Sequence, residues 1–112
     1  MSNSERFSEE LLSYAVVAGA SANLFANVQI GGISDLSVTV TNVGPGEITV
    51  YFKRSTSPGI APIELTALTK SLIVGGATEV VFNGNCGELF TLSVEETKGS
   101  NTTVNAAIRG MA

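Results

Sequence analysis

From residue 24 onward, apolar and polar residues alternate with a period of two, the pattern of a β-strand with one buried face. In the clearest run, Leu36, Val38 and Val40 alternate with hydroxyl side chains. The segments with this period are 24–30, 36–41, 48–52, 72–74, 79–82, 90–94 and 104–108, with a weaker alternation over 63–67. About eight short strands at such regular spacing predict a mainly β fold, an antiparallel β-sandwich or jelly roll.

Glycine and proline mark the turns between these segments. Residues 42–46 are expected to form a type II turn, in which Pro45 fixes φ and Gly46 supplies the positive φ at the next position. We therefore expect residues 36–52 to form a β-hairpin. Gly75-Gly76 predicts a second tight turn, before a return strand.

The first 22 residues do not share this rhythm. Ser2, followed three residues later by Glu5, fits a capping box. Apolar residues then recur at helical spacing, at Phe7, Leu11, Ala15 and Ala18. This spacing predicts an amphipathic helix over roughly residues 5–17. An extended arm is the alternative, because Tyr14, Val16 and Val17 also favour strands.

We accordingly divide the chain into an N-terminal helix or docking arm, residues 1–22, and a β-sandwich domain, residues 23–112. The arm is expected to contact a neighbouring subunit. The residues expected to make that contact are Phe7, Leu11, Leu12 and Tyr14.

The residues that most enzymes use are missing. The chain has no histidine, so serine–histidine and cysteine–histidine catalysis within one chain is excluded, as are zinc sites built from histidine and cysteine. Paired carboxylates are the remaining acid–base chemistry, and Glu95–Glu96 is such a pair. On a strand these two side chains point to opposite faces, so we expect solvated surface acids. We expect no catalytic, metal or cofactor site.

The one cysteine, Cys86, cannot close a disulfide within the chain. It lies in a turn-like stretch, Asn83-Gly84-Asn85-Cys86-Gly87. A free thiol is the simpler interpretation, and an intermolecular crosslink between copies in an assembly is the alternative.

Charge and polarity favour protein partners over other kinds. The net charge is −4, and the six bases are scattered, which predicts neither nucleic-acid binding nor a polybasic membrane anchor. Charged residues make up 14% of the chain, and the polar strand faces carry serine, threonine and asparagine instead. Such faces tolerate partial burial, and the strand edges have little charge to keep other strands away. We therefore expect neighbouring copies to cover these edges.

Three stretches carry a resemblance to known β-sandwich proteins: Leu36 to Gly44, Ile48 to Val50, and Leu72 to Ala77 before a valine-rich strand. Over about residues 35–110 the chain resembles the jelly-roll subunits of bacterial spore-appendage filaments and the small β-sandwich decoration proteins of tailed-phage virions. The appendage subunits carry cysteines on an N-terminal connector arm, and this chain has none there. The resemblance implies a building block rather than an enzyme.

We expect a non-enzymatic structural protein that assembles with copies of itself or with a larger scaffold such as a capsid, most simply as a virion decoration or other structural protein. The alternatives are a subunit of an extracellular filament, such as a spore appendage, and a carbohydrate- or ligand-binding module with Tyr51 and the loop 54–62 near its site. The N-terminus has acids where a secretion signal needs bases. We therefore expect synthesis in the host cytoplasm before incorporation into a virion, or into a filament at a cell or spore surface.

Overall fold

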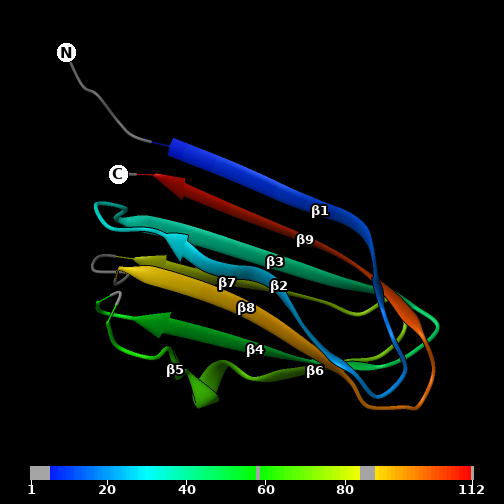
Figure 1. Cartoon of the computed structure of the whole chain (residues 1–112). Helices are drawn as coiled ribbons and strands as arrows, with labels where there is room; N and C mark the ends of the chain where they lie inside the picture. The colour runs from blue at the N-terminus through cyan, green and yellow to red at the C-terminus, as the bar shows by residue number, and fades with distance from the viewer. Residues whose placement is uncertain (1–5, 58, 84–87, 112) are drawn as a thin grey trace.

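The computed structural model describes residues 6–57, 59–83 and 88–111. These residues form β-strands and one short 3-10 helix, arranged as two facing sheets (Figure 1). The elements are β1 (Arg6–Val16), β2 (Ser21–Gln29), β3 (Asp35–Gly44), β4 (Ile48–Ser55), β5 (Ile63–Glu64), η1 (Thr66–Leu68), β6 (Lys70–Leu72), β7 (Ala77–Asn83), β8 (Leu89–Glu96) and β9 (Thr102–Met111).

The strand order identifies the topology. One sheet has the order β1-β9-β3-β7, and the other has the order β2-β8-β4-β5, with β6 also paired to β4. All pairings are antiparallel, and the chain crosses from one sheet to the other at almost every link. If β5 and β6, which both pair with β4, are counted as one interrupted strand, these are the eight strands of a jelly roll. The predicted mainly β, antiparallel sandwich is confirmed.

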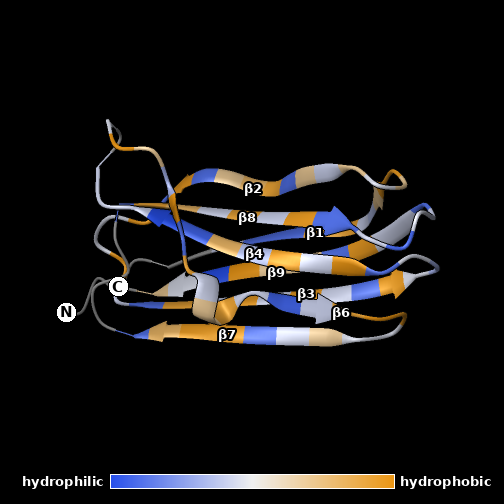
Figure 2. Ribbon diagram, turned by 90° about the horizontal axis from the view of Figure 1, so that it is seen from below, coloured by the Kyte–Doolittle hydropathy of each residue, from blue (hydrophilic) through white to orange (hydrophobic). Residues whose placement is uncertain are grey.

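The core lies between the sheets and is built by the period-two pattern (Figure 2). Each long central strand turns every second side chain inward, where branched aliphatic residues fill the space. Phe52 and Phe90 meet at the centre with their rings 6.5 Å apart, and Phe82 meets the Phe90 ring edge-on at 5.8 Å. The fully buried residues include Leu36, Val38, Val40, Ile48, Val50, Leu92, Val94, Val104 and Ile108.

The helix expected over residues 5–17 is wrong. Residues 6–16 form β1, which pairs with β9 along the edge of the first sheet. A bulge between Leu11 and Tyr14, with Ser13 at φ 55°, inserts an extra residue into the strand. Leu11 and Tyr14 therefore both pack on the core although they are three residues apart. A bulged strand imitates helical spacing in this way.

The β-hairpin expected over residues 36–52 is also wrong. β3 pairs with β9 and β7, whereas β4 pairs with β8, β5 and β6, so the link between them crosses from one sheet to the other. The turn differs as well. The positive φ, 100°, falls on Gly44, and the Gly44–Pro45 peptide is cis. Gly46 is needed for space, since a Cβ there would lie 2.6 Å from the Ser100 carbonyl oxygen.

Smaller differences follow from local irregularities. Two bulges in β2 bury Phe25 next to Leu24, although strict alternation places Phe25 on the outer face. The weak alternation over 63–67 gives a two-residue strand followed by η1. The strand expected at 72–74 ends at Leu72. This strand, β6, and the strand after it, β7, belong to different sheets and therefore form no hairpin.

The register of β3 can be tested with one buried position and one on the opposite face. Val40 is fully buried, so Val40→Asp places an unpaired charge in the core and is expected to cost about 4 kcal/mol or more and to abolish folding. Thr41→Asp, on the outer face of the same strand, is the control and should fold. Circular dichroism and thermal unfolding measure both. A folded Val40→Asp chain would show that the register is different.

Candidate assembly surfaces

One end of the sandwich is held by a buried carboxylate, that of Glu96, which is 2% exposed. Its Oε1 accepts hydrogen bonds from the backbone N–H groups of Gly19, Gly99 and Ser100, at 2.9, 2.7 and 3.2 Å. Its Oε2 accepts from those of Glu47 and Lys98, at 3.2 and 2.7 Å. This one side chain therefore accepts hydrogen bonds from three separate links, those between β1 and β2, between β3 and β4, and between β8 and β9.

The same contacts keep this carboxyl group ionised. Burial opposes ionisation, but the backbone N–H groups of Gly19, Lys98, Gly99 and Glu47 favour the charged form more strongly. Together they lower the pKa of Glu96 from its ordinary 4.5 to about 2. A group held this way is an anchor for loops and is not a general acid or base at neutral pH.

Asn42 holds the fourth link at this end. Its buried side-chain amide donates to the carbonyl oxygens of Gly46 (2.8 Å) and Leu72 (3.1 Å), and its Oδ1 accepts from the Thr102 hydroxyl (2.8 Å). Its backbone N–H donates to Gly76 and its backbone carbonyl accepts from Gly75. The link between β6 and β7 is thereby fixed against β3.

This fixed end displays apolar side chains to solvent. Ile73 is 67% exposed and Val74 is 50% exposed, both in the link between β6 and β7, which Figure 2 shows in the hydrophobic colour. Val43 and Val17 lie in neighbouring parts of the same end and are 48% and 65% exposed. Apolar residues in rigid, exposed turns are typical of contact surfaces when they gather.

The strands at the edges of the two sheets are protected to different degrees. β1 carries charges and a bulge, and β2 has two bulges, with Asn27 at φ 50°. β5 and β6 are very short. β7 has none of these features: it pairs regularly with β3 over seven consecutive positions and carries one charge, Glu79. Its free side is the least protected edge and the best suited to pairing with another chain.

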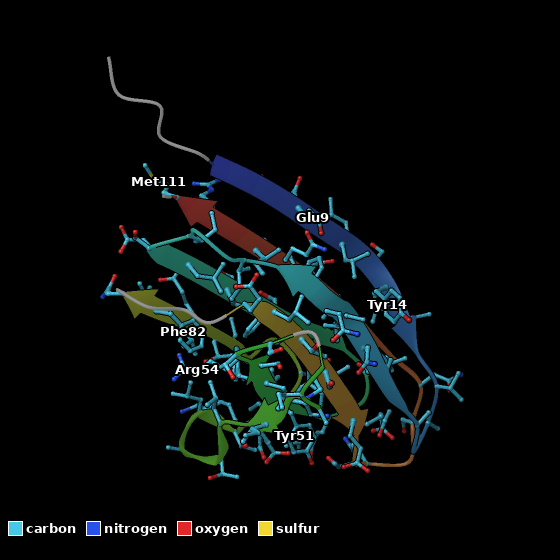
Figure 3. The ribbon with its side chains drawn as sticks, turned by 60° about the vertical axis from the view of Figure 1, so that its left-hand side comes forward. Glu9, Tyr14, Tyr51, Arg54, Phe82 and Met111 are labelled. Atoms are coloured by element: carbon cyan, nitrogen blue, oxygen red, sulfur yellow. The ribbon has the colours of Figure 1, made fainter. Side chains whose placement is uncertain are left out.

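A hollow of about 450 Å³ opens beside this edge, between β7 and η1. Its apolar walls come from Leu65, Ala67, Leu68 and Phe82. Thr66 and two side chains of opposite charge, Arg54 and Glu64, complete the lining. Figure 3 shows Arg54 on β4 close to Phe82 on β7, at the side where the sandwich is open.

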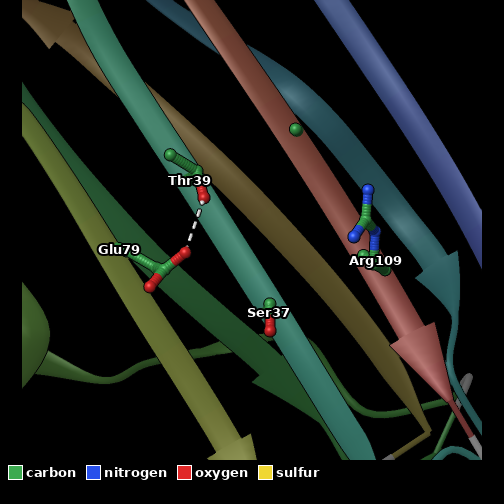
Figure 4. A pocket seen from close by; sticks show the side chains of 5 residues that line it. Ser37, Thr39, Glu79 and Arg109 are labelled. Atoms are coloured by element: carbon green, nitrogen blue, oxygen red, sulfur yellow. Dashed lines mark hydrogen bonds between the residues drawn. The ribbon is translucent and has the colours of Figure 1, made fainter.

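The outer face of the β1-β9-β3-β7 sheet is a shallow surface of small polar residues. Ser37 and Thr39 lie on β3, and the Thr39 hydroxyl donates to Glu79 Oε2 at 3.4 Å (Figure 4). With Ala107 and Arg109 these residues line a depression of about 290 Å³. Hydroxyl and alanine side chains cost less to desolvate than charged ones, whereas Glu79 and Arg109 would need partners in any molecule that covers this face.

The predicted site residues do not form one cluster. Leu11 and Tyr14 are half-buried and pack on the core, whereas Leu12 is 66% exposed at the bulge of β1. The side chain of Phe7 and the whole of Cys86 lie outside the described residues. Since residues 6–16 pair with β9, removing residues 1–22 would uncover that strand. The docking role of this segment stays a prediction.

Tyr51 lies on the outer face of the second sheet and is half-buried. Its hydroxyl donates to Glu95 Oε1 at 3.1 Å, and this hydrogen bond, with some desolvation and the negative charges of Glu95 and Glu64, raises the pKa of Tyr51. The phenol is thus already engaged with β8, which leaves it poorly placed as a free platform for a sugar.

Sequence reasoning missed Glu96, which was expected to be solvated. A usable signal exists: Phe90, Leu92, Val94 and Glu96 follow one another on the inward face of β8, so the alternation itself places this acid inside. Lys98-Gly99-Ser100, just after it, supplies three of the backbone N–H groups that donate hydrogen bonds to it.

Among the residues that the structure describes, no cluster of three or more acidic, cysteine or histidine side chains is placed to hold a metal ion. The same part of the chain contains no helix long and apolar enough to cross a membrane.

Comparison with known proteins identifies similar folds but no family. No protein-family model matches the chain, and no curated protein matches it in sequence. Solved structures match the chain, and those described below are 7–14% identical to it in sequence.

The exported protein XepA of PBSX aligns with a TM-score of 0.69 and 11% identity over 95% of this chain. This chain spans 37% of XepA. The SPBc2 prophage-derived protein YomS aligns with a TM-score of 0.60 and 12% identity, over 100% of this chain and 97% of YomS.

A subunit of Bacillus endospore appendages, disulfide-linked pili, aligns with a TM-score of 0.53 and 14% identity, over 96% of this chain and 86% of that subunit. Viral proteins share the fold too, among them the capsid protein of BFDV and the coat protein of Tobacco streak virus. The resemblance to phage, virion and spore-appendage subunits is confirmed at the level of the fold.

The role of Glu96 predicts an acid-dependent stability. Because the pKa of Glu96 is lower in the folded chain than its ordinary value, its contribution is complete above about pH 4.5 and is lost as the pH falls toward 2. Glu96→Gln keeps the shape, cannot accept all five N–H groups, and is expected to lower Tm by roughly 10 °C at pH 7.

Between pH 4.5 and 2, the Tm of Glu96→Gln should also fall less than the Tm of the wild type. Glu95→Gln, one residue away on the outer face, is the matched control and should change Tm little. Thermal unfolding from pH 7 to pH 2 measures all three proteins. Equal Tm values for Glu96→Gln and the wild type at pH 7 would contradict the anchoring role.

Proposed function

We propose that this chain is a non-enzymatic structural subunit that assembles with copies of itself or with a larger protein scaffold. The observation that carries the proposal is the β7 edge, which pairs regularly over seven positions, carries one charge, and lies next to a hollow with partly apolar walls. A monomeric protein normally protects such an edge, because unpaired backbone groups recruit other strands.

Two further observations support assembly. The outer face of the β1-β9-β3-β7 sheet carries small, easily desolvated side chains, with Ser37 and Thr39 half-buried in the chain alone. The solved structures that share the fold include a capsid protein, a coat protein and a pilus subunit. Those proteins are assembly subunits by description, and we extend that role to this chain.

As the specific assembly we propose a virion, with the chain acting as a capsid decoration or other structural protein made in the host cytoplasm. YomS, a prophage-derived protein of nearly the same length, supports this choice. A subunit of an extracellular filament at a cell or spore surface is the second candidate, supported by the likeness to the endospore appendage subunit.

Other functions have less support. The chain has no histidine, and the buried carboxylate of Glu96 is occupied by backbone N–H groups, which argues against acid–base catalysis. Carbohydrate binding would depend on Tyr51, whose hydroxyl is already bonded to Glu95. We propose protein partners, with no role for nucleic acid or membrane.

The edge can be tested with one exposed residue of β7. Val81 is 50% exposed on the outer face, so Val81→Lys adds a charge to the edge without disturbing the core. The variant is expected to keep its Tm and to associate roughly tenfold or more weakly, because the charge must be desolvated in any contact. Size-exclusion chromatography with light scattering measures the assembled fraction.

Val81→Thr is the matched control, since it keeps the β-branched shape and adds no charge. It should assemble like the wild type. Assembly of Val81→Lys at wild-type concentrations would contradict the role of this edge. Long open polymers would favour the filament, and closed rings would favour the virion.

A further inference from the structure

The link between β6 and β7 is unusual for its composition. Turn tips are mostly glycine, proline, asparagine, aspartate or serine, whereas this one presents Ile73 and Val74, 67% and 50% exposed. Residues 73–76 carry no charge. In an isolated molecule this exposure brings no benefit, because two branched apolar side chains remain in water.

The turn is also held in one conformation. The Gly76 N–H donates to the Ile73 carbonyl at 2.9 Å, with Gly75 at φ 80°. Gly75 N–H donates to the Asn42 carbonyl at 2.7 Å, and Asn42 N–H donates to the Gly76 carbonyl at 2.8 Å. Val74 fills the space beside Gly44, where a Cβ would lie 2.7 Å from Val74 Cγ1. A turn fixed in advance loses little conformational entropy on binding.

The hollow beside β7 is the complementary feature on the same chain. Its volume is about 450 Å³, and its apolar part is formed by Leu65, Ala67, Leu68 and Phe82. Arg54, Glu64 and Thr66 make the rest of the lining polar. A branched apolar group can therefore be buried against the apolar part of this lining.

The projection and the hollow cannot meet within one molecule. The turn immediately precedes β7, and Phe82 lies near the far end of that strand. A strand rises about 3.3 Å per residue, so the two features lie on the order of 17 Å apart. Both can be buried when the turn of one copy enters the hollow of another.

We infer that the Ile73–Val74 turn docks into the hollow lined by Leu65, Ala67, Leu68 and Phe82 of a second copy of this chain. This inference rests on the proposed assembly function and names its contact. The two surfaces differ, so the contact is heterologous and repeats from copy to copy, giving an open chain or a closed ring.

Two exposed positions allow each half of the contact to be removed separately. Ile73→Asp places a charge on the apolar turn and leaves the hollow unchanged. Ala67→Asp places a charge in the hollow and leaves the turn unchanged. Each variant alone is expected to fold with nearly the wild-type Tm and to associate at least about tenfold more weakly.

A mixture of the two variants is the decisive sample. The intact hollow of Ile73→Asp and the intact turn of Ala67→Asp fit each other once, so light scattering should find 1:1 dimers that grow no further. Val17→Asp, which is 65% exposed at the same end, is the control and should assemble like the wild type.

The outcomes separate this inference from the function on which it rests. If the wild type assembles but the mixed variants stay monomeric, or if Ile73→Asp alone assembles normally, the turn-in-hollow contact is wrong and the assembly function stands. If the wild type is monomeric at every concentration, the assembly function itself fails.

Discussion

Five backbone N–H groups converge on the Glu96 carboxylate at the end of the sandwich where β1, β3 and β8 finish. In a jelly roll the chain crosses repeatedly between two sheets, so this end consists of links. The backbone N–H groups of these links have no partner strand to which they could donate hydrogen bonds. Buried amides without partners are costly. One ionised side chain meets that need for three links together, and the positions of those links depend on it.

Asn42 extends the same arrangement to the remaining link, and this connects the fold to the proposed function. Because its amide and backbone groups bind both the β3–β4 turn and the β6–β7 turn, the apolar tip at Ile73 is set in place by the core. The polar interior of this end therefore has a consequence on the surface: it fixes an exposed apolar turn. Stability and assembly share residues at this end.

The core could be predicted from the sequence, because a period of two specifies which face of each strand is buried, as at Leu36, Val38 and Val40. Strand partners could not, since alternation is the same whether β3 and β4 pair or face each other across the core. The bulge at Ser13 places Leu11 and Tyr14 on the same face of β1 although they are three residues apart, and this spacing predicted a helix instead of a strand. Glu96 was missed because acids were assumed to be outside, although its phase on β8 placed it inside. The hollow depends on how η1 is placed beside β4 and across from β7, which no local pattern encodes.

We propose that this jelly roll is a building block whose β7 side is covered by another protein chain. The chain has a mass of 11.5 kDa, and its low charge and its β7 edge favour association. Sedimentation equilibrium of the wild-type chain over a hundredfold range of concentration tests this most directly. The account predicts an average mass that rises with concentration in multiples of the single chain. A constant mass of one chain across the whole range would contradict it.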